Sequence, residues 1–188
     1  MIGIKGAAAT FTVFWYRNTI LRTEMNFRCQ VSRTLDDEHR ANLELMGRVE
    51  QAFARAPRGS ATAFAELVPL LATLAREVEQ DIARHFAFEE RELFPLLEAA
   101  GQGDLVGLLG EEHLAIREVA AELLPLARAA VAGTLNAAGW DALKRLAGEL
   151  VERLVAHIEK ETMALLPMLD DLLDDETDRG LSFAYAEA

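Results

Sequence analysis

The chain has 188 residues, of which 51% are hydrophobic, and a formal net charge of -12 at pH 7. This length suits one domain, and the apolar content suffices for a buried core. The negative charge argues against binding to nucleic acid, whose phosphates attract basic surfaces. The single cysteine excludes an intramolecular disulfide and a cysteine-based metal cage, so we expect a reducing compartment, the cytoplasm.

Residues 1–31 form an extension that differs from the rest of the chain. Its first part is net basic, and an apolar run extends from Gly6 to Tyr16. Such a run is too short to span a bilayer. Its length suits the hydrophobic region of a signal peptide, but no convincing small-residue cleavage site follows it. We therefore expect a poorly ordered extension rather than a targeting signal, and no association with a membrane.

From residue 32 onward the sequence is rich in alanine, leucine, glutamate and arginine, which favour helices. Breaks at 56–60, 101–103 and 133–139 contain glycine and predict loops. No alternating run of β-branched residues predicts a strand. The segments between the breaks carry apolar residues three or four apart, as amphipathic helices do. The predicted helices span residues 33–55, 61–99, 104–132 and 139–172.

All four histidines lie on these apolar stripes, one in each predicted helix. A glutamate follows the second and the fourth histidine by four residues, which places each histidine and glutamate on one helix face. Six side chains should therefore point into the core. They are His39, His85, Glu89, His113, His157 and Glu161.

The two halves of the sequence repeat each other. The segment 35–39 resembles the segment 109–113, and the segment 85–97 resembles the segment 157–169. Short loops make successive helices antiparallel. The sequence therefore predicts an all-α, up-down-up-down four-helix bundle with a pseudo-two-fold internal repeat. We assign residues 32–173 to this bundle and residues 174–188 to an acidic C-terminal tail.

Four imidazoles and two carboxylates buried in one layer indicate a metal site. Buried carboxylates need a compensating positive charge, and the nearby basic residues fall largely off the apolar stripes. Two cations would supply that charge, with each glutamate bridging ions about 3.5–4 Å apart. The mixed nitrogen and oxygen donors suit iron, manganese or zinc better than calcium or magnesium.

Other charged residues and two prolines lie close to these six. Glu38 and Glu112 each precede a histidine, and we predict that they face solvent. The alternatives are acceptors for an imidazole N–H or additional ligands. Asp37, Glu90 and Glu111 are predicted as surface charge.

Two prolines lie at equal distances past the two glutamates, and each is predicted either to kink or thin its helix or to end it. They are Pro95 and Pro167.

The order of the six residues resembles that of the bacterial hemerythrin-like, or HHE cation-binding, domain family. The resemblance covers about residues 32–173 and includes a Leu-x-Pro motif after each glutamate. It implies a four-helix bundle around a non-haem di-iron centre with an oxo or hydroxo bridge, and the six residues as its ligands. It also implies handling of O2, NO or peroxide, in the oxidative or nitrosative stress response or in repair of iron centres.

The chain departs from the oxygen-carrying hemerythrins, which have five histidines. Arg117 occupies the position of their additional histidine, and the last motif ends in Glu161 rather than an aspartate. Simple O2 transport is therefore not expected. The ferritin-like class is disfavoured, because no histidine has a glutamate three residues before it. A non-enzymatic iron or oxygen sensor, a bundle with a structural metal, and a homodimer stay open as alternatives.

Overall fold

The structure is a computed structural model that describes residues 25–55 and 61–187. Within these ranges all regular elements are helices, which confirms the all-α prediction. Residues 1–24 of the predicted extension, the predicted loop at 56–60 and residue 188 lie outside the described residues. No helix in the described ranges has the length and apolar character needed to cross a bilayer.

The helical stretches coincide closely with the four predicted helices. The first and the third are the uninterrupted helices α2 (Gln30–Arg55) and α6 (Gly103–Val131). The second consists, in order, of α3 (Ala61–Arg76), η1 (Glu77–Ile82), α4 (Ala83–Phe88), η2 (Glu89–Leu93) and α5 (Phe94–Ala99). The fourth consists of α7 (Ala137–Lys160), η3 (Glu161–Leu165) and α8 (Leu166–Leu172). A further helix, α9 (Asp175–Glu187), ends the described chain.

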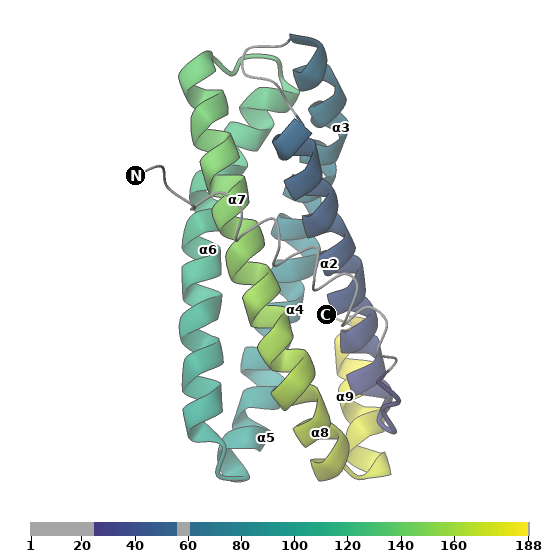
Figure 1. Ribbon diagram of the computed structural model, residues 1–188. Coiled ribbons are helices and arrows are strands. Elements are labelled where there is room, and N and C mark those ends of the chain that lie inside the picture. Colours follow the sequence, from purple (N-terminus) through teal and green to yellow (C-terminus); the bar gives the residue numbers. More distant parts are fainter. Residues whose placement is uncertain (1–24, 56–60, 188) are drawn as a thin grey trace, which may run out of the picture.

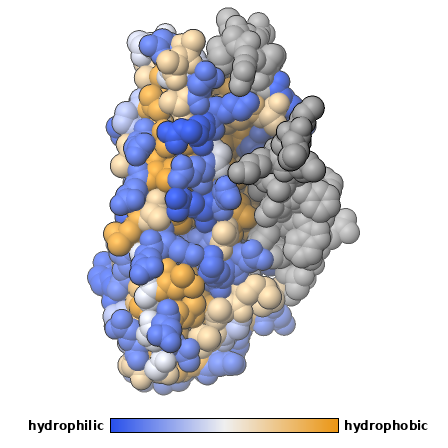
Figure 2. All heavy atoms as spheres, turned by 60° about the vertical axis from the view of Figure 1, so that its left-hand side comes forward, coloured by the Kyte–Doolittle hydropathy of each residue, from blue (hydrophilic) through white to orange (hydrophobic). Residues whose placement is uncertain are grey.

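These helices pack as a bundle, since α2 and α6 each contact both α3 and α7 (Figure 1). Two clusters of buried apolar side chains fill it, one on each side of the histidines along the helices. Leu74, Leu123 and Leu150 belong to the first cluster, and Leu35 and Leu97 belong to the second. Hydrophilic side chains predominate on the outer face that Figure 2 shows. The apolar stripes therefore hold the histidine-bearing faces toward one another.

A π-helical turn lies shortly before each of the prolines Pro95 and Pro167. The turn η2 begins at Glu89 and η3 begins at Glu161, and Pro95 and Pro167 each lie two residues beyond the end of such a turn. Proline lacks an N–H, and its ring clashes with the carbonyl four residues earlier in an α-helix. The wider π turn accommodates this defect. The helices therefore widen before the prolines and do not end there.

The acidic segment 174–188 contains helix α9, which packs against α2 (Figure 1). Leu181 and Tyr185 of α9 are buried. The carboxylate of Asp178 accepts hydrogen bonds from the backbone N–H groups of Gln30 and Val31 at 2.7 and 2.9 Å. These N–H groups belong to the first turn of α2 and have no partner within that helix. Residues 175–187 are therefore a helical part of the molecule that packs against the bundle.

Candidate metal centre

The six side chains predicted as ligands meet in one buried layer of the bundle. Each is at most 3% exposed. The π turns place both glutamates at the start of a widened helical segment, and such turns often occur at functional sites. The layer consists of His39 on α2, His85 on α4, Glu89 on η2, His113 on α6, His157 on α7 and Glu161 on η3.

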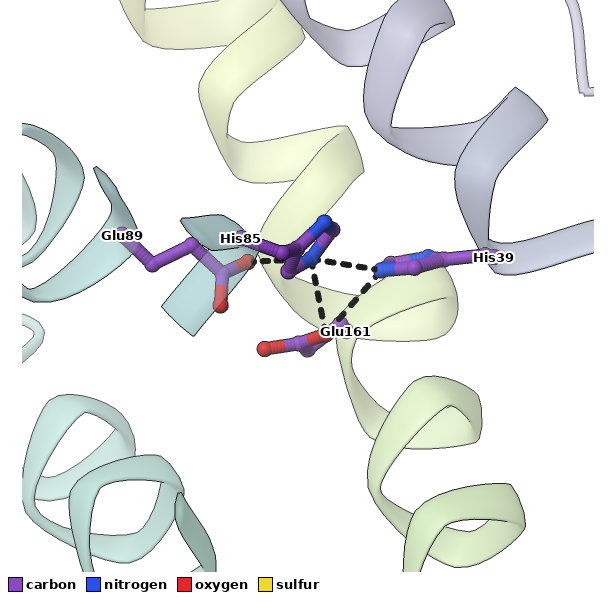
Figure 3. Close-up of side chains that lie close together, drawn as sticks. All are labelled: His39, His85, Glu89 and Glu161. Carbon is purple, nitrogen blue, oxygen red and sulfur yellow. Dashed lines mark hydrogen bonds and ion pairs between the residues drawn. The ribbon is translucent and has the colours of Figure 1, made fainter. Parts of the chain in front are cut away.

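The ligand atoms form two groups of four, and within each group all lie within 4.8 Å of one another. Both groups share the two glutamates. We call the one with His39 and His85 the His39–His85 position, and the other the His113–His157 position. Figure 3 shows His39, His85, Glu89 and Glu161, which form the first of these groups.

Each glutamate directs one oxygen to each position. Glu89 places Oε1 3.3 Å from His85 Nε2 and Oε2 3.3 Å from His113 Nε2. Glu161 places Oε2 3.1 Å from His39 Nε2 and Oε1 3.0 Å from His157 Nε2. Both carboxylates therefore have the orientation of a bridge between two cations.

None of these four carboxylate oxygens has a hydrogen-bond donor, although all are buried. The imidazole Nε2 atoms lie 3.0–3.3 Å away, but none forms a hydrogen bond with these oxygens. Leaving an ionised carboxylate buried without a partner is costly. A cation in each position would satisfy the oxygens and the imidazole lone pairs together, so the residues fit a pair of metal ions.

The outward-facing nitrogen of each histidine has a partner on a neighbouring helix. Three of the partners are carboxylates and the fourth is a hydroxyl. The distances from Nδ1 are 2.9 Å for His85 to Glu38, 2.8 Å for His113 to Glu90, 3.1 Å for His157 to Glu112 and 3.2 Å for His39 to Thr162. When Nδ1–H donates to such an acceptor, Nε2 keeps its lone pair for a metal.

Three of these partners correct the sequence prediction. Glu38 and Glu112 were predicted to face solvent and Glu90 to be a surface charge, but each accepts a hydrogen bond from a buried histidine. Their side chains are 26%, 24% and 36% exposed, in that order, so they stand at the edge of the bundle. Each reaches across to a neighbouring helix, which the direction of a residue on its own helix does not reveal.

The basic residues predicted to lie off the ligand stripes stand outside this layer and neutralise the outer carboxylates. Arg84 donates to Glu38 at 2.7 Å. Arg117 donates to both oxygens of Glu90 at 2.7 and 3.1 Å. Lys160 lies 2.7 Å from Glu112. The positive charges therefore support the histidine partners and do not take the place of a metal.

In the absence of metal, protons would provide the positive charge of the layer. Burial disfavours a charged imidazole, but the carboxylates around it raise the pKa of His113 to about 9. Burial acts the same way at His85, and Glu89 and Glu38 nevertheless raise its pKa well above the usual range. The pKa of Glu161 lies well below its usual range, because His157 and His113 outweigh the opposing effect of burial. Such a cluster favours cations in place of protons.

A small void of about 10 Å³ adjoins the ligand layer. His39, His85, His157 and Glu161 border it, and the remaining lining residues are Asn42, Ile82, Phe86, Leu154 and Ile158. A void of this size holds about one water molecule. The void beside the layer can therefore hold only a very small molecule.

The whole site lies in the part of the chain that matches a family model. A family model described as the hemerythrin HHE cation binding domain matches residues 30–169, a range that includes all six ligand-layer residues. No significant match was found among the curated proteins. Helix α9, with Tyr185, lies beyond the matched range.

Proposed function

The chain belongs to the hemerythrin HHE cation-binding domain family, and from that premise we propose that it is a non-haem di-iron protein. Its di-iron centre would bind O2, NO or peroxide. The protein would handle these molecules in the oxidative or nitrosative stress response or in repair of iron centres. The two groups of four ligand atoms that share both glutamates are the observation that carries this proposal. Imidazole and carboxylate donors around open positions suit iron.

The six residues of the layer would hold the two irons. Each iron would receive two imidazole nitrogens and one oxygen from each glutamate, with an oxo or hydroxo group completing the bridge. This set leaves room in the coordination sphere for an external ligand. The bound irons would supply redox chemistry toward O2, NO or peroxide.

The chain itself would select the ligand by size. The void beside His39 and Glu161 has apolar walls and only about 10 Å³ of space. Asn42 is the one polar side chain among its lining residues that is not a proposed iron ligand. We expect its amide to form a hydrogen bond with a small polar ligand and the apolar walls to exclude organic substrates.

An optical titration tests this function. The protein is loaded with ferrous iron without oxygen and then mixed with O2, hydrogen peroxide or an NO donor. We expect near-ultraviolet bands from a di-iron centre that change with at least one of these ligands. Asn42→Leu should alter the response to the ligand while the iron content stays at two per chain. Equimolar zinc with no such bands would instead select a structural metal site.

A non-enzymatic sensor is the second candidate, and one contact favours it. The Tyr185 hydroxyl of α9 donates a hydrogen bond to Glu38, which is also the acceptor for His85. A change at the site could therefore reach α9. Hydrogen exchange along α9, measured with and without NO or O2, would change on ligand binding without turnover if this candidate is right.

We also propose a helix topology and an internal symmetry for the bundle. Residues 32–173 would form an up-down-up-down four-helix domain whose halves are related by a pseudo-two-fold axis. We place the protein in the cytoplasm, where Cys29 would stay reduced. A homodimer is a further proposal, which sedimentation velocity tests.

A further inference from the structure

The sequence repeat aligns residue 90 with residue 162, because each directly follows the glutamate of a repeated histidine–glutamate pair. Both aligned side chains serve a histidine. Glu90 accepts from Nδ1 of His113 at 2.8 Å, and Thr162 Oγ1 lies 3.2 Å from Nδ1 of His39. One acceptor is a carboxylate and the other a neutral hydroxyl, so the repeat breaks at this point.

The surroundings of the two acceptors differ in the same sense. Arg117 forms hydrogen bonds with both oxygens of Glu90. The repeat that aligns His113 with His39 also aligns Arg117 with Leu43, which is buried. Thr162 is itself only 4% exposed. The charged pair Glu90 and Arg117 in one half of the molecule therefore corresponds to a neutral hydroxyl and an apolar side chain, Thr162 and Leu43, in the other.

A second difference affects His85, the other histidine of the His39–His85 position. Glu38 Oε2 accepts from His85 Nδ1 and also from the Tyr185 hydroxyl. The Tyr185 ring is held by Phe88, with ring centroids 4.5 Å apart, and by the Arg84 guanidinium, 4.7 Å from the ring centroid. In the described part of the chain, no aromatic hydroxyl donates in this way to Glu112, the counterpart of Glu38. An oxygen shared by two donors binds each of them less strongly.

We propose that the two metal positions are inequivalent, and that the His39–His85 position holds its ion more weakly because of Thr162 and Tyr185. This inference rests on the proposed function, since it requires two ions. A carboxylate acceptor at Nδ1 makes an imidazole a more basic ligand, and changes to such partners typically alter metal affinity by about 10–100-fold. Charge-assisted hydrogen bonds are also roughly twice as strong as neutral ones. Thr162 and Tyr185 are therefore positioning residues, which act through His39 and His85.

Iron release to a ferrous chelator, from protein loaded with two irons and kept reduced, tests the inference. We expect two phases of one iron each, with rates that differ by about 10–100-fold. Mössbauer spectra of protein loaded with ⁵⁷Fe should show two signals of equal area, and the partly depleted protein should lose one of them. A single release phase for two irons would overturn the inference, whereas a chain that binds no iron would overturn the proposed function.

Exchanging the acceptors between the halves makes the test specific. Glu90→Thr should accelerate the slow phase toward the fast one, and Thr162→Glu should retard the fast phase. If Thr162→Glu does not fold, Thr162→Val removes the acceptor and should accelerate the fast phase further. Thr73→Val is the matched control, because Thr73 donates to the Pro69 carbonyl in α3. If these three site variants leave both phases of iron release unchanged, the roles assigned to Glu90 and Thr162 are overturned.

Tyr185→Phe separates this role from simple packing. Loss of the hydroxyl frees Glu38 Oε2 for His85 alone, so the fast phase should become slower. If Tyr185 only held the bundle together, the same change would make iron leave faster. A faster fast phase in Tyr185→Phe would therefore overturn its role as a positioning residue.

Discussion

The Nε2 atoms of His113 and His157 lie 3.1 Å apart. Their Nδ1 atoms face Glu90 and Glu112, which as carboxylates accept hydrogen bonds and thereby fix the ring hydrogens on the outside. Two nitrogen lone pairs then face each other across the layer, and they would repel one another unless a proton or a cation lies close by. We therefore expect the metal-free and metal-loaded proteins to respond differently to pH.

Removal of the metal should make the protein less stable as the pH rises. In the metal-free layer burial opposes the charge on His113, but the carboxylates raise its pKa from 6.5 to about 9. Because the folded pKa lies above the unfolded one, the stabilisation is fully present below about pH 6.5 and is lost as the pH passes through about 9. We expect the Tm of metal-free protein, measured by circular dichroism, to fall over this range.

Metal-loaded protein is the control for this pH dependence. Its Tm should hold or rise over the same range, because protons compete less with the metal at higher pH. A Tm that rises with pH in the metal-free protein would contradict the charge arrangement of the layer.

Glu90→Gln should weaken metal binding without unfolding the bundle. The amide is a poorer acceptor for His113 than the carboxylate, and loss of such a partner costs about 10–100-fold in metal affinity. Competition against a chelator of known affinity would measure the change. Glu111→Gln is the matched control, because Glu111 is an exposed carboxylate on α6, the helix that carries His113. Equal affinities for the two variants would show that Glu90 does not act on the site.

Asp178→Ala should lower the free energy of unfolding by about 1–2 kcal/mol, the usual cost of losing a helix cap. The Asp178 carboxylate accepts from two N–H groups that begin α2, so its loss leaves them without this partner. Urea denaturation of Asp178→Ala and of the exposed control Asp171→Ala would measure the difference. If both variants unfold like the parent protein, α9 contributes nothing to the stability of α2.

The helices and the ligand layer could be predicted because helical periodicity alone decides which face a residue occupies. His39 and Glu161 lie on the apolar stripes of their own helices, so their inward direction follows from local sequence. Glu38 and Glu90 could not be placed in this way. Each contacts a histidine on another helix, and that distance depends on how the helices pack. The one available signal was that each directly follows or precedes a ligand-layer residue.

Helix α9 escaped prediction for a related reason. An acidic run favours a solvated segment when it is considered by itself. Asp170 in fact accepts from the backbone N–H groups of Arg28 and Cys29, at 2.9 and 2.7 Å, and Asp178 accepts from the start of α2. The carboxylates of Asp170 and Asp178 therefore accept hydrogen bonds from backbone N–H groups of residues 28–31. Sequence periodicity does not detect such a long-range contact.

The metal content of the purified protein, measured by mass spectrometry after growth with iron, tests the central claim most directly. We expect two irons per chain in the parent protein and in the exposed control Glu111→Ala, and loss of both in Glu161→Ala, because Glu161 directs one oxygen to each position. Two irons retained by Glu161→Ala, or none bound by the parent protein when iron is supplied, would contradict the account.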